Sequence, residues 1–115
     1  MHHGAALARL SHQPALPKAV AFGTWGEVPE RMAALLRYSV KLTLEPWTMK
    51  EEDVEKLRSA GLSDRDIVDA NQIVCYYAYA NRLTDGLGVQ LEDTWPEEIR
   101  AKRGYPIRDD PTLWR

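Results

Sequence analysis

The sequence has little cysteine and no long apolar run, and each shortage argues against a class of protein. Cys75 is the only cysteine among 115 residues, so no disulfide can form within the chain, unlike in a secreted, disulfide-stapled domain. No stretch of about 18 consecutive apolar residues occurs, which argues against a membrane span. The first residues lack the basic region, apolar stretch and cleavage site of a signal peptide. We therefore expect a cytoplasmic protein that contacts no membrane.

An excess of positive charge is also lacking. The formal net charge is −2 and the sequence pI is about 5.9, whereas proteins that neutralise phosphates need a clear basic excess. The one basic cluster consists of Arg100, Lys102, Arg103 and Arg108, and we interpret it as the solvated end of a short helix. We expect no nucleic-acid partner.

What the sequence does contain is apolar residues at helical spacing. Hydrophobic residues make up 44% of the chain and charged residues 28%, which suits one soluble domain over residues 1–115. No convincing strand pattern occurs, so we predict an all-α fold of about five helices. The expected segments are 2–10, a short turn of helix over 15–22, Pro29 to Pro46, Thr48 to about Ala60, and Ser63 to Gly86. A last short helix after Thr94 and an extended tail over 104–115 complete the prediction.

Capping signals mark the ends of the two later helices. Thr48 and Glu51 have the Thr-x-x-Glu spacing of a capping box, so we expect Thr48 to cap the helix that follows. Gly61 is predicted to end that helix in a left-handed conformation. Ser63 is predicted to cap the next helix, with Asp66 in its first turn.

The middle of the last long helix is apolar on all sides from Ile73 to Ala80. Such a helix is buried on most sides, either inside the monomer or at a subunit contact. Cys75 lies in this segment, and we interpret it as a small buried hydrophobic residue. Asn71 and Asn81 interrupt the apolar pattern, and a buried amide must find hydrogen-bond partners.

Three stretches together resemble a known family. They are "HHGAAL" at 2–7, "YSVKLT" at 38–43 and "GLSDRDIVDANQIVCYYAYANRLTDGLGV" at 61–89. Their order and spacing resemble the peroxidase-related enzymes of the alkylhydroperoxidase D-like, carboxymuconolactone decarboxylase-type superfamily, and the likeness covers about residues 2–92. The resemblance implies an all-helical fold and a homo-oligomer, a dimer or larger.

The resemblance also implies a reactive site. In the family, a Cys-x-x-Cys-x-x-x-His motif on one helix, with an upstream glutamate, reduces hydroperoxides: one thiolate attacks the peroxide, the other cysteine resolves the sulfenic acid, and His and Glu relay protons. His3 corresponds to the motif histidine, with His2 beside it. The second cysteine corresponds to a position ahead of Met1, and Cys75 matches no motif cysteine. The resemblance therefore implies that this chain is the C-terminal part of the family's fold, without its N-terminal helices and cysteine pair.

Three functions follow as alternatives. The first is a peroxidase-related protein whose full-length form reduces hydroperoxides, with His3 and His2 as the catalytic residues present here. This chain itself is expected to be inactive as a dithiol peroxidase. The second is a non-enzymatic, oligomerising helical scaffold, because helix faces left uncovered favour association. The third is a cysteine-independent carboxymuconolactone decarboxylase-like enzyme with His3 as the base.

No cofactor and no metal site are expected. Neighbouring residues on a helix point about 100° apart, so His2 and His3 are poorly placed to share a metal ion. The other interpretation of the two histidines is the remnant of a purification tag. The continuation into "GAALARL", part of which matches the family segment, favours the end of a redox helix.

Overall fold

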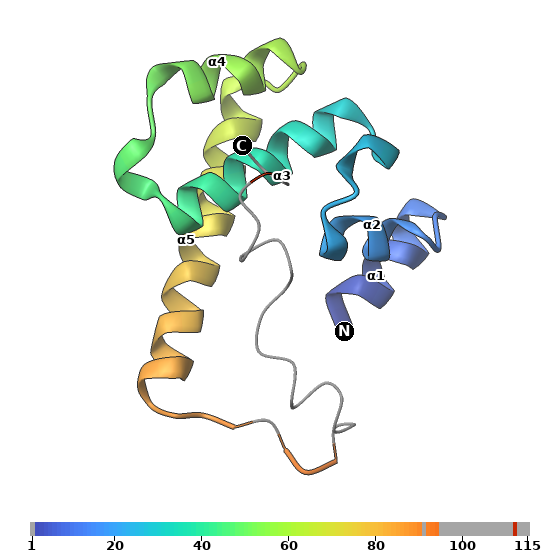
Figure 1. Cartoon of the computed structure of the whole chain (residues 1–115), viewed down its shortest axis with the longest axis vertical. Coiled ribbons are helices and arrows are strands. Elements are labelled where there is room, and N and C mark those ends of the chain that lie inside the picture. Colours follow the sequence, from blue (N-terminus) through green and yellow to red (C-terminus); the bar gives the residue numbers. More distant parts are fainter. Residues whose placement is uncertain (1, 91, 95–111, 113–115) are drawn as a thin grey trace.

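The computed structural model describes residues 2–90, 92–94 and 112, and its regular elements are helices (Figure 1). The α-helices are α1 (His2–Ser11), α2 (Leu16–Phe22), α3 (Glu30–Leu44), α4 (Glu51–Ser59) and α5 (Asp64–Gly86). Two short 3-10 helices, η1 (Trp25–Glu27) and η2 (Pro46–Thr48), flank α3. The predicted all-α fold of about five helices is confirmed. The helix expected after Thr94, the basic cluster near it and the 104–115 tail, apart from Thr112, lie outside the described residues.

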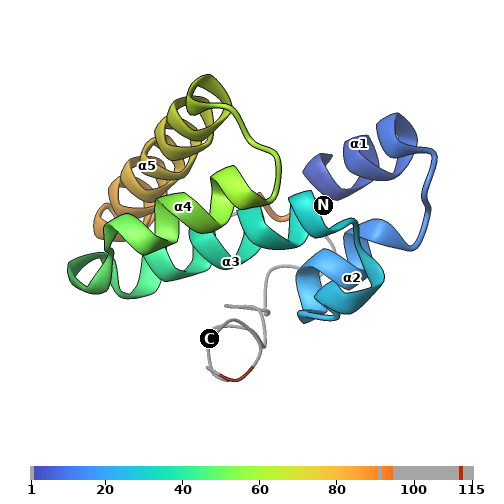
Figure 2. The same cartoon turned by 90° about the horizontal axis from the view of Figure 1, so that it is seen from above.

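Helix α3 is the centre of the fold, with α1 and α2 towards one of its ends and α4 and α5 packed along it (Figure 2). The core accordingly divides into two clusters. Around Ala33, the first contains Leu16, Ala19, Trp25 and Val28. Around Ala34 and Tyr38, the second contains Leu57, Leu62 and Ile67. Neighbouring residues of α3 therefore serve different clusters, because consecutive side chains on a helix point about 100° apart.

The predicted helix end at Gly61 and the predicted helix cap at Ser63, between α4 and α5, are confirmed. Gly61 has a φ of 84°, a left-handed conformation that only glycine adopts at little cost. The Ser63 hydroxyl accepts a hydrogen bond from the Asp66 backbone N–H at 3.2 Å, and the Asp66 carboxylate accepts one from the Ser63 N–H at 2.9 Å. This reciprocal pair satisfies two backbone donors and fixes where α5 begins.

The predicted start of α4 is wrong. Thr48 ends η2, and its hydroxyl donates to the Glu45 carbonyl at 2.8 Å instead of capping a helix. Helix α4 begins at Glu51, and the Asp53 carboxylate accepts the Lys50 backbone N–H at 3.0 Å. The turn that begins at Pro46 occupies Thr48, and three consecutive acidic residues favour a helix start two residues later because they stabilise the positive end of the helix dipole.

The prediction that α5 is buried on most sides inside the monomer is also wrong. Its first half packs against α3 and α4, whereas its second half extends beyond them (Figure 1). Cys75 is exposed, so its interpretation as a buried residue fails as well. The reason is geometric: the buried and half-buried side chains at 67, 71, 74 and 78 recur on one face, and the opposite face is uncovered within the described part of the chain.

Candidate functional site

The predicted catalytic residue His3 lies in the first turn of α1 and is exposed. Its imidazole meets the ring of Tyr77 edge-on, with the ring centroids 5.8 Å apart and an interplanar angle of 83°. Such an edge contact between aromatic rings is favourable because the positive edge of one ring faces the negative face of the other. The fold thus brings the start of the chain to the second half of α5. His2, the other predicted residue, is the first residue of the same helix.

The cysteine is not part of this arrangement. The Cys75 thiol contacts the Asn71 side-chain oxygen at 3.6 Å, one turn earlier on α5. Asn71 in turn donates to the hydroxyl of Tyr38 at 2.9 Å, which ties α5 to α3. Among the residues that the structure describes, no group of three or more His, Cys, Asp or Glu side chains is placed to hold a metal ion.

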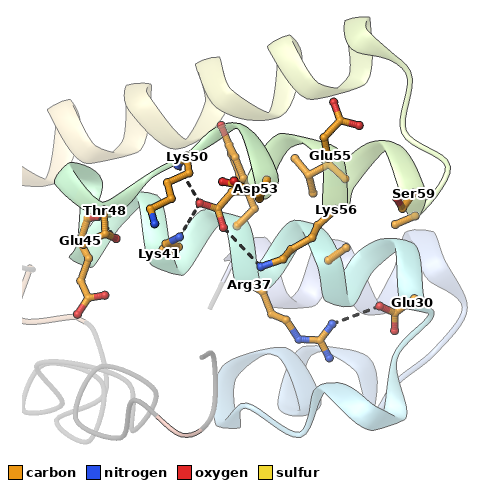
Figure 3. A pocket seen from close by; sticks show the side chains of 15 residues that line it. Glu30, Arg37, Lys41, Glu45, Thr48, Lys50, Asp53, Glu55, Lys56 and Ser59 are labelled. Carbon is orange, nitrogen blue, oxygen red and sulfur yellow. Dashed lines mark hydrogen bonds and ion pairs between the residues drawn. The ribbon is translucent and has the colours of Figure 1, made fainter.

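An open groove of about 990 Å³ runs between α3 and α4 (Figure 3). Its lining is strongly charged and includes Arg37, Lys41, Lys50 and Lys56 together with Glu30, Glu45, Glu52, Asp53 and Glu55. Asp53 is the one charged residue classed as buried in the described part of the chain, at 8% exposure. A buried carboxylate needs partners, because removing a charge from water is costly unless it is paired and hydrogen-bonded.

Asp53 has these partners. Its carboxylate accepts hydrogen bonds from the Lys41 ammonium and the Lys50 backbone N–H, and the Lys56 ammonium lies 3.8 Å away. Burial alone would raise the pKa of Asp53, but the hydrogen bonds from Lys41 and Lys50 and the positive charges of Lys41 and Lys56 outweigh it and lower the pKa. On the α3 side of the groove, Arg37 pairs at 3.3 Å with Glu30, which lies seven residues earlier on the same helix.

These contacts hold α4 against α3. Lys41 belongs to α3 and Asp53 to α4, so their ion pair fastens one helix to the other. Because the buried carboxylate of the groove is already paired with lysines of α3 and α4, we assign the groove a structural role. The sequence gives one signal for it, the run of three acidic residues at 51–53, but the partner on α3 is set by packing.

The most prominent surface is the uncovered face of α5. Ile73, Tyr76, Ala80, Leu83 and Leu87 follow each other at steps of three and four residues, which is the a/d repeat of a helix that pairs with another helix. We call these five residues the α5 seam. The four large side chains are 58%, 64%, 48% and 73% exposed, in sequence order.

The flanks of the α5 seam are uncharged. The positions that would border a paired helix are Gln72, Tyr77, Tyr79, Thr84 and Gly86. Tyr77 and Tyr79 are themselves more than 40% exposed, so they widen the apolar surface. Soluble proteins rarely leave a large exposed apolar patch open to water, so the α5 seam is a candidate interaction site.

Comparisons with known proteins found no matching family model, no similar curated protein and no similar solved structure. None of the described helices is both long enough and apolar enough to cross a membrane.

Proposed function

We propose that the 115-residue chain is a self-assembling helical scaffold of the alkylhydroperoxidase-like type, and that it works as a homo-oligomer formed through the α5 seam. The observation that supports this proposal is the exposed a/d repeat on the second half of α5, opposite the face that packs on α3. An a/d repeat of apolar residues is the pattern by which one helix packs against another.

The magnitudes suit reversible association. Fully burying a large apolar side chain stabilises by about 1.5–3 kcal/mol. Two copies of the seam offer eight such side chains, each roughly half exposed, which gives about 6–12 kcal/mol on pairing. Association costs about 4–15 kcal/mol in lost freedom. The largest gain less the smallest cost is about 8 kcal/mol, so the seam supports a reversible dimer, in the micromolar range at its tightest, rather than a permanent complex.

The test is the mass of the particle in solution. Light scattering across a concentration series is expected to give at least twice the 13.1-kDa chain mass at tens of micromolar, in the range set by this affinity. Leu83→Lys places a charge in the seam and is expected to give the monomer mass. Asn81→Lys adds the same charge on the same helix, outside the seam, and is expected to leave assembly unchanged. A single 13.1-kDa species at every concentration contradicts the proposal.

The proposal also predicts no dithiol peroxidase activity for this chain. The dithiol mechanism needs one thiol to attack the peroxide and a second to resolve the sulfenic acid, and Cys75 is the only cysteine. Hydroperoxide consumption in the presence of a dithiol reductant should be equal for the chain and for Cys75→Ser. Catalytic turnover that disappears in Cys75→Ser would show that the scaffold assignment is wrong.

A second candidate function is hydroperoxide reduction by the cysteine pair of the family. The observation that favours it is the contact of His3 with Tyr77, which brings the residue matching the motif histidine to α5. The measurement is the intact mass and N-terminal sequence of the protein made from its own gene in its own cell. A longer product with Cys-x-x-Cys ahead of His2 supports this candidate, whereas a product that starts at Met1 removes it.

A further inference from the structure

We infer that the partner of the α5 seam is a second copy of this chain, and that the two α5 helices pair antiparallel. The two-fold axis between them passes through the seam at the level of residue 78 along the helix. This inference rests on the proposed function and adds the direction and the register in which the two copies pair. A closed two-fold contact uses the same patch on both copies, so the patch must be complementary to itself. Charge and side-chain size both show that it is.

The charges of the patch suit a second copy. Between residues 70 and 90 the only charged residues are Arg82 and Asp85, and both lie outside the seam and its flanking positions. The seam and its flanking positions are therefore uncharged and bring no like charges together when they face a second copy. A strongly acidic or basic partner would find no counter-charge here, and partner choice along paired helices depends on such counter-charges.

The direction follows from Asp69. Continuing the repeat one step towards the start of α5 places Asp69 on the line of the seam, where its side chain is 60% exposed. Parallel pairing sets Asp69 of one copy beside Asp69 of the other, which is destabilising. Antiparallel pairing about residue 78 moves the two carboxylates 18 residues apart along the helix axis, about 27 Å.

The register follows from the sizes of the seam residues. In the antiparallel pair, Tyr76 faces Ala80 of the other copy, and Ile73 faces Leu83 of the other copy. The largest side chain of the seam, Tyr76, then opposes the smallest, Ala80, which fills the contact evenly. In a parallel pair, Tyr76 faces Tyr76 and Ala80 faces Ala80, so one layer is crowded and the next is hollow. Crowding and cavities each cost free energy.

Cysteine cross-linking separates the two directions. All variants carry Cys75→Ser, so that only introduced thiols react. The pair Ile73→Cys with Leu83→Cys is expected to give a covalent dimer on mild oxidation, because the two positions face each other between copies. Leu87→Cys alone is expected to give none, because its two copies lie about 27 Å apart and a disulfide needs Cα atoms within about 7 Å. A Leu87→Cys dimer, or the absence of a dimer from Ile73→Cys/Leu83→Cys, overturns the inference, because Leu87 faces its own copy only in the parallel pair.

A second measurement avoids altering the seam. A spin label at Val89→Cys, just beyond α5 and outside the seam, is expected to report a distance between copies of about 33 Å or more for the antiparallel pair. A distance below about 20 Å indicates the parallel pair and overturns the inference. Light scattering on the same samples separates the failures. A monomer contradicts the proposed function, whereas a dimer with the wrong cross-links or distance contradicts only the inferred partner geometry.

Discussion

The two halves of α5 have the same helical geometry and opposite surroundings. In the first half, Ile67 is 7% exposed and packs with Tyr38, Leu57 and Leu62. In the second half, Ile73 is 58% exposed, although both isoleucines belong to one unbroken helix. The first half is part of the hydrophobic core, and the second half presents an exposed apolar face. Burial of an apolar residue here depends on where α3 and α4 reach, because α5 itself is regular throughout.

The two isoleucines give the largest expected difference. Ile67→Ala should lower the free energy of unfolding by about 2–5 kcal/mol, because it removes buried methyl groups and leaves a cavity. Ile73→Ala should change it by less than about 0.5 kcal/mol in the monomer, because its side chain already faces solvent. Urea denaturation at a concentration below the assembly range measures both.

Ile73→Ala has a different readout at higher concentration, where it should weaken assembly. Equal losses of monomer stability for the two variants would contradict the division of α5. The dilute sample is the control that keeps dimer dissociation out of the comparison.

Asp53 provides the next largest effect, because its ion pair with Lys41 holds α4 against α3 and so supports the covered half of α5. Asp53→Asn should lower the free energy of unfolding by about 1–3 kcal/mol at pH 7, since the half-buried Lys41 ammonium loses its charge partner. The pKa of Asp53 is lowered in the folded chain. Its stabilisation is therefore present above the unfolded pKa, about 3.9, and is lost as the pH falls through the folded pKa.

Urea unfolding of both proteins at pH values from 7 to 2 measures the contribution of Asp53 to stability. The difference in stability between the wild-type chain and Asp53→Asn should shrink below about pH 4. Asp85→Asn, at the exposed end of α5, is the matched control and should follow the wild-type curve. A difference between wild type and Asp53→Asn that stays constant down to pH 2 would rule out the paired carboxylate.

Two asparagines, one in each half of α5, test the same difference between a covered and an exposed half with polar side chains. Asn71→Ala should cost about 1–2 kcal/mol, because the hydroxyl of the buried Tyr38 loses its hydrogen-bond partner. Asn81→Ala should change the stability by less than about 0.5 kcal/mol, because Asn81 is exposed. Thermal unfolding of both variants tests the pair, and a larger loss for Asn81→Ala would show that the second half of α5 is covered.

Local chemistry explains which parts of the fold could be predicted. The start of α5 depends on Ser63 and Asp66, three residues apart, and the turn before it depends on the left-handed Gly61, so the sequence alone was sufficient there. The start of α4 was predicted wrongly at Thr48 because the same motif competes with a 3-10 turn that begins at Pro46. The all-round apolar stretch predicted a covered helix, but periodicity cannot say which neighbours exist.

The candidate surfaces were less predictable for the same reason. The contact of His3 with Tyr77 and the ion pair of Asp53 with Lys41 each join residues from different helices. Tertiary packing, rather than local sequence, brings these residues together. The α5 seam could be found from its spacing, since steps of three and four residues are visible in the sequence. The exposure of the seam could not be predicted, because it depends on where α3 ends relative to α5. The family resemblance and the role it implies for His3 stay predictions.

Cys75 gives the smallest expected effect on stability and tests the second half of α5 directly. Cys75→Ser should change the free energy of unfolding by less than about 0.5 kcal/mol, because the thiol is exposed and its contact with Asn71 lies within its own helix. In the folded protein the thiol should react with a thiol reagent nearly as fast as in the urea-unfolded chain. Cys75 lies outside the α5 seam and its flanking positions, so this reactivity should also persist in the assembled form. Strong protection of the thiol would mean that α5 is covered on more than its two apolar faces, and the division of the helix into a core half and an interface half would fail.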